Sequence, residues 1–244
     1  GAVPYSVRRR LLPHLLAGLS ETDKLTASLP TMEGLLRHAR ANGLQPGGIV
    51  DLGPSAGDWS RMAASVYPEV PLVMLEGNPE REPALGQAAR ELGSGARVIM
   101  GVLGSTAREQ VPFYTAGTGS SMFPELTTFE KGTRLLSMAT LDEVLEATHG
   151  AATLAAPLLL KLDVQGAELE VLKGGEATLA LAELVILETS TIPYNEGAPL
   201  LAEVVSFMSE RGFVIYDFCG QLRRESDNTL YQTDVAFVRT DSVL

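Results

Sequence analysis

The chain has 244 residues, of which 45% are hydrophobic and 20% charged, with 19 Lys and Arg against 30 Asp and Glu. This length and composition indicate one large globular domain and exclude a disordered chain. The net charge of −11 argues against a nucleic-acid partner, and the single cysteine, Cys219, excludes a disulfide framework and any zinc site built from several cysteines.

The N-terminal 46 residues carry no motif that we can assign. Within residues 1–20, Arg8–Arg10 precede several leucines, and we expect a short amphipathic helix that packs on the domain. Contact with a membrane surface through the arginines is the alternative, whereas Pro13 and His14 interrupt the apolar stretch that a signal peptide would need. No stretch reaches the roughly 18 apolar residues of a membrane span. No transmembrane segment is therefore predicted, and the sparing use of cysteine favours a cytoplasmic location.

From residue 30 onward, segments of helical period alternate with short apolar runs. Helices are predicted at 30–42, 58–67, 80–92, 141–148, 168–181 and 200–211, and strands at 48–52, 71–75, 97–103, 158–163, 183–188, 213–218 and 234–239. This alternation predicts βαβ units. Residues 219–232 leave little room for a crossover helix, so the last two strands should be antiparallel neighbours. We expect a Rossmann-like α/β fold over residues 47–244: a doubly wound, mainly parallel seven-stranded sheet with one antiparallel strand near its end, preceded by a helical extension, residues 1–46.

The segment 104–139 fits no regular element well and contains several glycines and serines. A loop of this length in a compact domain is usually a lid or a binding loop. The other interpretation is a surface excursion with a β-hairpin of its own. Both interpretations stay open at this point.

The sharpest local signal is the turn that follows the first strand, within residues 49–60. Asp51 ends the strand, and Gly53 and Gly57 flank a tight turn that lets a ligand approach the backbone. A phosphate loop would need a lysine after the last glycine, and a dinucleotide fingerprint would need a third glycine. An acid at this place instead suits a ligand with an ammonium group. A strand–turn–helix corner without a ligand is the alternative.

Two further acids are predicted at the ends of neighbouring strands. Glu76 ends the second strand, where a carboxylate can accept both hydroxyls of a ribose. Lys161 and Asp163 lie in or at the end of a strand expected to be buried, where charges are costly unless they are paired or functional. The carboxyl ends of parallel strands share one edge of the sheet, so Asp51, Glu76 and Asp163 should face one crevice.

Three stretches together resemble the motifs of the FkbM-type S-adenosylmethionine-dependent methyltransferases, which have the class I methyltransferase fold. They are VDLGPSAGDWS at 50–60, LEGNP at 75–79 and KLDVQGAELEVLKGG at 161–175. The resemblance covers roughly residues 47–240. It departs from the family pattern at Pro54, where a small residue is more usual, and at Gln165, where an acid is frequent.

The resemblance implies a site for S-adenosyl-L-methionine across the first four strands. The residues that it assigns to the cofactor are Asp51, Gly53, Ser55 and Gly57 at the amino-acid end, Glu76 at the ribose, Asn78 beside the adenosine, Val102 and Leu103 at the adenine, and Asp163 near the methyl group. It also implies methyl transfer to a hydroxyl of a sugar, a glycan or another small natural product. A homo-oligomer is left open.

Methyl transfer to an alcohol requires a positioned acceptor and the removal of a proton. Asp163 is the first candidate for the base and Glu188, at the end of the fifth strand, is the second. Together they could instead hold a divalent cation, and Glu188 could also be a strand-end acid with a purely structural contact. Residues 115–125 and 189–197 are expected to form the acceptor pocket, with Tyr114 and Tyr194 as stacking candidates. An NAD-linked oxidoreductase and a non-catalytic cofactor-binding scaffold are the competing hypotheses.

Overall fold

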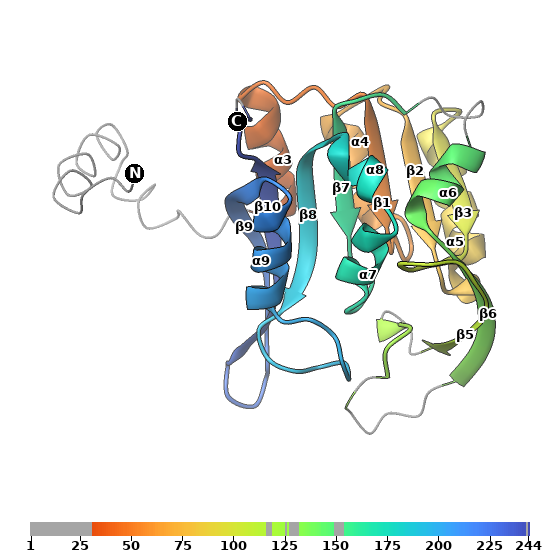
Figure 1. The fold of residues 1–244 in the computed structure, drawn as a ribbon. Helices are drawn as coiled ribbons and strands as arrows, with labels where there is room; N and C mark the ends of the chain where they lie inside the picture. The colour runs from red at the N-terminus through yellow and green to blue at the C-terminus, as the bar shows by residue number, and fades with distance from the viewer. Residues whose placement is uncertain (1–30, 116–118, 125, 127–131, 149–153, 243) are drawn as a thin grey trace, which may run out of the picture.

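The computed structural model describes residues 31–244 except 116–118, 125, 127–131, 149–153 and 243 (Figure 1). The N-terminal helix expected within residues 1–20 therefore lies outside the described residues. None of the described helices has the length and apolar character needed to cross a membrane.

A seven-stranded sheet forms the centre of the molecule (Figure 1). Its strands, in spatial order, are β3 (Ala96–Met100), β2 (Leu72–Glu76), β1 (Gly48–Leu52), β7 (Leu158–Leu162), β8 (Ala182–Ser190), β10 (Leu230–Arg239) and β9 (Phe213–Arg223). β10 runs antiparallel to both of its neighbours, and the pairs from β3 to β8 are parallel. The predicted fold class, including the antiparallel last pair, is confirmed. The strand order reverses between β1 and β7, which is where open α/β sheets bind ligands.

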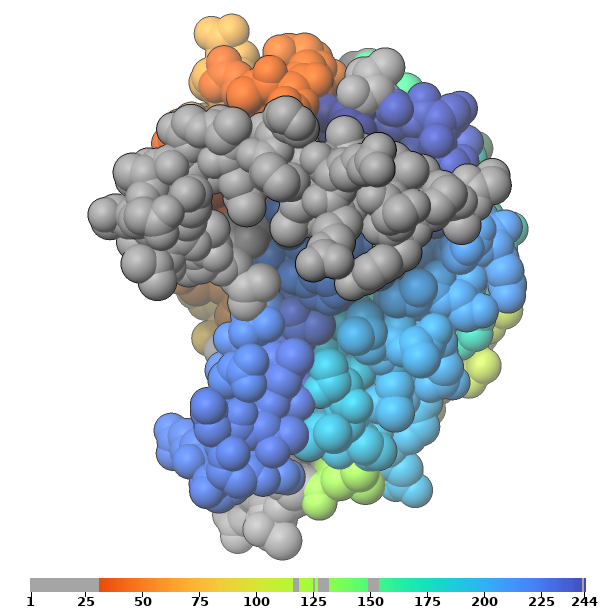
Figure 2. All heavy atoms as spheres, turned by 90° about the vertical axis from the view of Figure 1, so that its left-hand side faces the viewer, coloured from red at the N-terminus to blue at the C-terminus, as the bar shows by residue number. Residues whose placement is uncertain are grey.

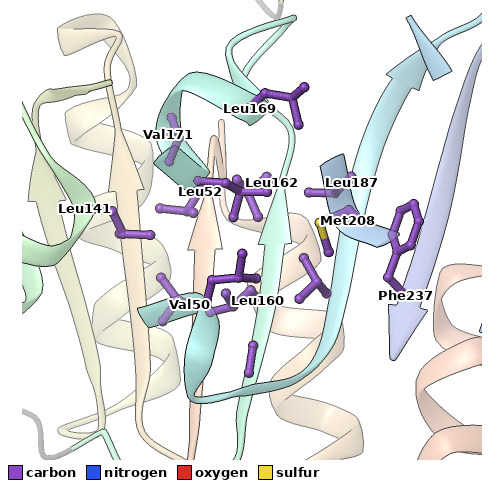
Figure 3. Packing of buried hydrophobic residues seen from close by; sticks show 14 of the residues in the cluster. Val50, Leu52, Leu141, Leu160, Leu162, Leu169, Val171, Leu187, Met208 and Phe237 are labelled. Carbon is purple, nitrogen blue, oxygen red and sulfur yellow. The ribbon is translucent and has the colours of Figure 1, made fainter. Parts of the chain in front are cut away.

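Helices cover both faces of this sheet. The helices on one face are α3 (Met32–Ala41), α4 (Asp58–Val66) and α5 (Glu82–Leu92), the last entered through the short helix η1 (Pro79–Arg81). Those on the other face are α6 (Leu141–Ala147), α7 (Glu168–Lys173), α8 (Glu176–Ala180) and α9 (Leu201–Glu210). Side chains of a strand alternate between the two faces. Ile49 therefore packs with the first group of helices, while Val50 and Leu52 pack with the second (Figure 3).

The predicted third strand, 97–103, is divided between two sheets. β3 ends at Met100, and after Gly101 the chain enters β4 (Val102–Leu103), which belongs to a separate sheet of order β4-β6-β5. β5 (Arg108–Thr115) and β6 (Gly132–Ala139) pair antiparallel within the segment that fits no regular element in the sequence. The segment thus contains a β-hairpin of its own, and it also lines a cavity as a binding loop would; Figure 1 places this small sheet at one end of the molecule.

The predicted helix 168–181 is also divided, at Gly174 and Gly175. A Cβ on Gly174 would lie 2.1 Å from the carbonyl oxygen of Gly104, which means that the backbones of these two segments touch. The break therefore brings α7 against the start of the small sheet.

We expect Leu160→Ala to lower the free energy of unfolding by about 2–5 kcal/mol, because it opens a cavity between strands and helices. Leu160 is fully buried in the core of Figure 3. Urea unfolding measures the change. Leu181→Ala is the matched control, because Leu181 is 51% exposed, and its effect should stay within about 0.5 kcal/mol. Equal effects of the two substitutions would contradict this assignment of the core.

Candidate active site

A cavity of about 340 Å³ lies at the carboxyl ends of the parallel strands. Its walls come from the turns after β1, β2, β7 and β8, from the small sheet with the loop inside it, and from the hairpin of β9 and β10. Of the residues assigned from the sequence, Gly53, Ser55, Glu76, Val102, Leu103, Asp163 and Glu188 line it. The cavity therefore joins residues that are distant in the sequence at the reversal point of the strand order.

The turn after β1 depends on glycine at position 53. Gly53 has a φ of +79°, and a Cβ there would lie 1.8 Å from the carbonyl oxygen of Asp163. The Gly53 N–H donates to the carbonyl of Leu75 at 2.9 Å. The turn is thus pressed against β7 on one side and bonded to β2 on the other, and it forms a fixed wall of the cavity.

Glu76 is held in the wall by two backbone donors. Its Oε2 accepts from the N–H of Ser55 at 3.0 Å, and its Oε1 accepts from the N–H of Asn78 at 2.8 Å. Burial raises the pKa of Glu76, and these hydrogen bonds oppose that shift. A carboxylate has about four acceptor positions, so each oxygen can accept a further hydrogen bond from a ligand.

An apolar slot lies beside Glu76. Val102 and Leu103 line it, as assigned from the sequence, and Phe113 and Met122 complete it. Phe113 was not predicted from the sequence, whereas Met122 belongs to the segment 115–125 that was expected at the acceptor pocket. The signal for Phe113 was the alternation with Val111, since both are buried on β5. Met122 lies in a loop whose position depends on the fold around it.

Asp51, Gly57 and Asn78 lie outside the set of described residues that line the cavity. Gly57 caps α4 with a φ of +84°, and a Cβ there would lie 2.7 Å from the Cβ of Ala88 on α5. The Asn78 side chain accepts from the Glu80 N–H and donates to Ser120 Oγ at 3.2 Å. Gly57 thus lets two helices pack, and Asn78 supports a cavity-lining serine.

Asp51 is fully buried behind the wall, beside the buried Lys161. Its Oδ2 accepts from Ser60 Oγ at 2.5 Å, and its Oδ1 lies 3.8 Å from Lys161 Nζ and has no hydrogen bond in the described part of the chain. Lys161 Nζ also lies 3.1 Å from Asp163 Oδ2. Burial lowers the pKa of Lys161, but the charges of Asp163 and Asp51 outweigh it and leave this pKa above its usual value. The lysine is charged and paired.

Asp163 and Glu188 meet at one amide group. Gln165 Nε2 donates to Asp163 Oδ1 at 2.8 Å and to Glu188 Oε2 at 2.7 Å. Burial, followed by the charge of Asp163, raises the pKa of Glu188 to about 10. Burial also raises the pKa of Asp163, but Lys161 and the bond from Gln165 lower it further than that, below its usual value. At neutral pH Asp163 is therefore the ionised member of the pair and Glu188 the protonated one.

A second buried acid fixes the turn after β7. Glu168 Oε1 accepts from the N–H groups of Val164 at 3.0 Å and Gly166 at 3.2 Å. Burial raises its pKa to about 7. Within the described residues, no group of three or more His, Cys, Asp or Glu side chains is arranged to hold a metal ion.

The outer part of the cavity is aromatic. The rings of Tyr194 and Tyr231 lie 5.9 Å apart between centroids with a 40° tilt, and both line the cavity with Leu222 and Gln232. Tyr194 belongs to the segment expected at the acceptor. The other three come from the hairpin of β9 and β10, which projects from the lower end of the molecule in Figure 2. No residue of this hairpin was predicted at the site from the sequence. Tyr114 is outside the lining set of described residues.

A sheet of this order, with acids and a glycine turn around a cavity at its reversal point, agrees with the class I methyltransferase fold expected from the sequence. The chain belongs to the FkbM methyltransferase family: the family model described as "Methyltransferase FkbM domain" matches residues 56–215. The protein is accordingly an S-adenosylmethionine-dependent methyltransferase, and the hypothesis of an NAD-linked oxidoreductase is wrong. The site suits this cofactor, because it offers a fixed carboxylate for a diol beside an apolar slot for a flat ring.

Solved structures of several methyltransferases are similar to this chain. The O-methyltransferase TomG from Streptomyces achromogenes is 12% identical with a TM-score of 0.48, over 98% of this chain and 91% of that one. Magnesium protoporphyrin IX methyltransferase from Synechocystis PCC 6803 is 14% identical with a TM-score of 0.47, over 98% of this chain and 86% of that one. No curated protein sequence matches the chain. At these identities the structural likeness carries no information about the acceptor.

We expect Glu76→Gln to weaken binding of S-adenosylhomocysteine by about 10- to 100-fold, the usual effect of a lost hydrogen bond to a charged group. An amide at this position offers fewer acceptor positions for the hydroxyls of a ribose. Isothermal titration calorimetry measures the affinity. Glu82→Gln, an exposed acid at the start of α5, is the matched control and should bind as the wild type does. Unchanged binding by Glu76→Gln would remove Glu76 from the cofactor site.

Glu188 should also make stability depend on pH. A carboxyl group whose folded pKa is raised contributes stability below its unfolded pKa and loses it as the pH rises toward the folded value. With a folded pKa of about 10, Glu188 should lower the free energy of unfolding progressively from about pH 5 upward. Glu188→Gln copies the protonated acid, so its decline should be shallower in urea unfolding at about pH 5, 7 and 9. Glu146→Gln, on the exposed side of α6, is the control and should keep the wild-type slope. The same slope in Glu188→Gln and in the wild type would contradict the raised pKa of Glu188.

Proposed function

We propose that the protein transfers the methyl group of S-adenosylmethionine to a hydroxyl oxygen of a small neutral or cationic molecule, such as a sugar, a glycan unit or another natural product. The observation that carries this proposal is the pair formed by Asp163 and Glu188. Both acids line the same cavity as Val102 and Leu103 beside Glu76 and as Tyr194 and Tyr231, and one amide joins them. One ionised and one protonated carboxyl group at this place suit an alcohol acceptor.

The cofactor half of the cavity would be divided among residues already described. Gly53 and Ser55 would approach the amino-acid end, Glu76 would accept the ribose hydroxyls, and Val102 and Leu103 would flank the adenine together with Phe113. Asp51 would act from behind the wall, where its Oδ1 lacks a hydrogen bond among the described residues. When bound, the cofactor supplies a methyl group on a positively charged sulfur, which is a good leaving group.

Asp163 would act as the base. In-line displacement would form the bond between the acceptor oxygen and the methyl carbon, break the bond from that carbon to sulfur, and release the hydroxyl proton. The ionised Asp163 can accept this proton or orient the hydroxyl through a hydrogen bond. Glu188 holds its own proton at neutral pH, so it would donate a hydrogen bond to a neighbouring acceptor oxygen. Holding the acceptor in line replaces a bimolecular encounter by a positioned one.

The acceptor half of the cavity favours a ring without negative charge. Asp163 and Glu188 line it with the two tyrosines, Leu222 and the amide of Gln232, whereas the lining cation Arg81 acts on Glu76. Tyrosine rings stack on sugars or flat rings, and amides bond hydroxyl groups. An anionic acceptor would meet the charge of Asp163, which makes a phosphorylated substrate unfavourable.

Methyl-labelled S-adenosylmethionine and a panel of sugars, glycosides, phenols and polyketides test the proposal. We expect label in the product as a methyl ether, identified by mass spectrometry and NMR. Label transferred to nitrogen, to carbon or to nucleic acid would overturn the proposed O-methylation, even though the protein remains a methyltransferase. Parallel reactions with and without a chelator determine whether a divalent cation takes part.

We expect Asp163→Asn to lower kcat by about 10²- to 10⁴-fold, the usual contribution of a positioned base. Binding of S-adenosylhomocysteine should change much less, because Asp163 acts on the proton of the acceptor. Calorimetry and single-turnover kinetics separate the two effects, and Asp241→Asn, whose side chain is 79% exposed, is the control. Unchanged turnover in Asp163→Asn would exclude Asp163 as the base.

A further inference from the structure

Gln165 has a backbone conformation that residues other than glycine rarely adopt. Its φ is +55°, in the left-handed region, and the following Gly166 has a φ of +96°. A Cβ on Gly166 would lie 2.6 Å from the Cβ of Ala198, so the turn is packed tightly against the loop after β8. Such conformations persist where the surroundings fix them, and they cluster at functional sites.

Two separate loops fix Gln165 through its backbone carbonyl. The oxygen accepts from Ser121 Oγ at 2.8 Å and from Asn195 Nδ2 at 2.5 Å. Ser121 follows Ser120 in the loop between β5 and β6, and the buried Asn195 follows Tyr194 in the loop after β8. Ser120 and Tyr194 both line the cavity. The carbonyl of Gln165 therefore joins the turn after β7 to two walls of the site.

The side chain of Gln165 has one workable orientation. Its Nε2 donates to both Asp163 and Glu188, and the reversed amide would place its oxygen against the ionised Asp163 carboxylate, which has no proton to donate. Gln232 Nε2 donates to the same oxygen of Glu188 at 3.1 Å, from the hairpin side of the cavity. Gln165 is the side chain that bonds both acids, and it is uncharged, so it brings them together without adding to their negative charge.

We propose that Gln165 is a positioning residue. Its amide holds Asp163 and Glu188 as one pair facing the acceptor. Its backbone carbonyl, bonded to Ser121 and Asn195, fixes the position of that pair relative to the loop between β5 and β6 and the loop after β8. The turnover measurements of this inference rest on the proposed function. The titration measurements do not, since they report the two acids directly.

Gln165→Asn is the first test. Asparagine tolerates the left-handed backbone, but its amide is one methylene shorter and cannot reach both acids. We expect kcat to fall by about 10- to 100-fold, as when reacting groups are misplaced by about 1 Å. The KM for S-adenosylmethionine and the affinity for S-adenosylhomocysteine should stay within about threefold of the wild type, because the ribose and adenine contacts are elsewhere. Gln87→Asn, on the exposed side of α5, is the matched control and should leave all of these values unchanged.

Gln165→Glu is the second test, because it keeps the side-chain length and adds a third acid. The added charge should raise the pKa of Asp163, so the acidic limb of the pH profile of kcat/KM should move to higher pH by about one unit or more. Carboxyl-carbon NMR of protein labelled at Asp and Glu should show the same displacement with S-adenosylhomocysteine bound and no acceptor present. Gln87→Glu adds the same charge on the exposed side of α5 and should leave both readouts at their wild-type positions.

The inference is overturned if Gln165→Asn and Gln165→Glu titrate and turn over like the wild type. It is also overturned if they lose thermal stability and cofactor affinity together, since that result describes a residue needed only for folding. Displaced carboxyl titrations with full cofactor affinity support the inference even where no hydroxyl acceptor is found. That result would contradict the proposed methylation of a hydroxyl group and would still support the positioning role of Gln165.

Discussion

The site depends on a single buried cation. Lys161 lies inside the central sheet, 3.1 Å from Asp163 and 3.8 Å from Asp51. A buried charge is tolerated only when it is paired, and without the lysine two carboxylates would share a water-poor interior. Its charge keeps Asp163 ionised, and that charge in turn is one reason why Glu188 holds its proton. The different protonation of two neighbouring acids thus depends on the burial of Glu188 and on one charged side chain behind the cavity wall.

The parts of the site that we propose for the cofactor and for the acceptor are built on elements of different kinds. The cofactor part rests on β1, β2 and the small sheet that begins after Gly101, and backbone bonds such as those to Glu76 fix it. The acceptor part rests on the turn after β7, the loop after β8 and the hairpin of β9 and β10. Asp163 belongs to both, because its carbonyl oxygen lies against Gly53 while its side chain faces Glu188 across Gln165.

Local pattern predicted most of the fold, since buried parallel strands appear as apolar runs and their helices carry the matching period. It failed where the chain is broken by contacts distant in sequence. The close approach of Gly104 and Gly174 splits a predicted helix, and departure at Gly101 splits a predicted strand. In the site, acids at strand ends were predictable from position alone. Phe113, Tyr231 and Gln232 were not, because the geometry of hairpins brings them to the cavity, and no short sequence pattern encodes that geometry. The hydrogen bond from Asn78 to Ser120 was not predictable either, because it joins residues that are distant in the sequence.

The hairpin of β9 and β10 lies at one edge of the sheet and projects beyond it (Figures 1 and 2). It supplies Leu222, Tyr231 and Gln232 to the cavity, whereas the residues around Glu76 and Gly53 sit in the interior strands and their turns. Changes in the length or sequence of its tip would reshape the entrance while leaving the interior pairing of strands intact. On the division of the site that we propose, acceptor choice can change with this hairpin while the residues proposed to hold S-adenosylmethionine stay the same, and exchange of the hairpin is a practical route to redirecting the enzyme.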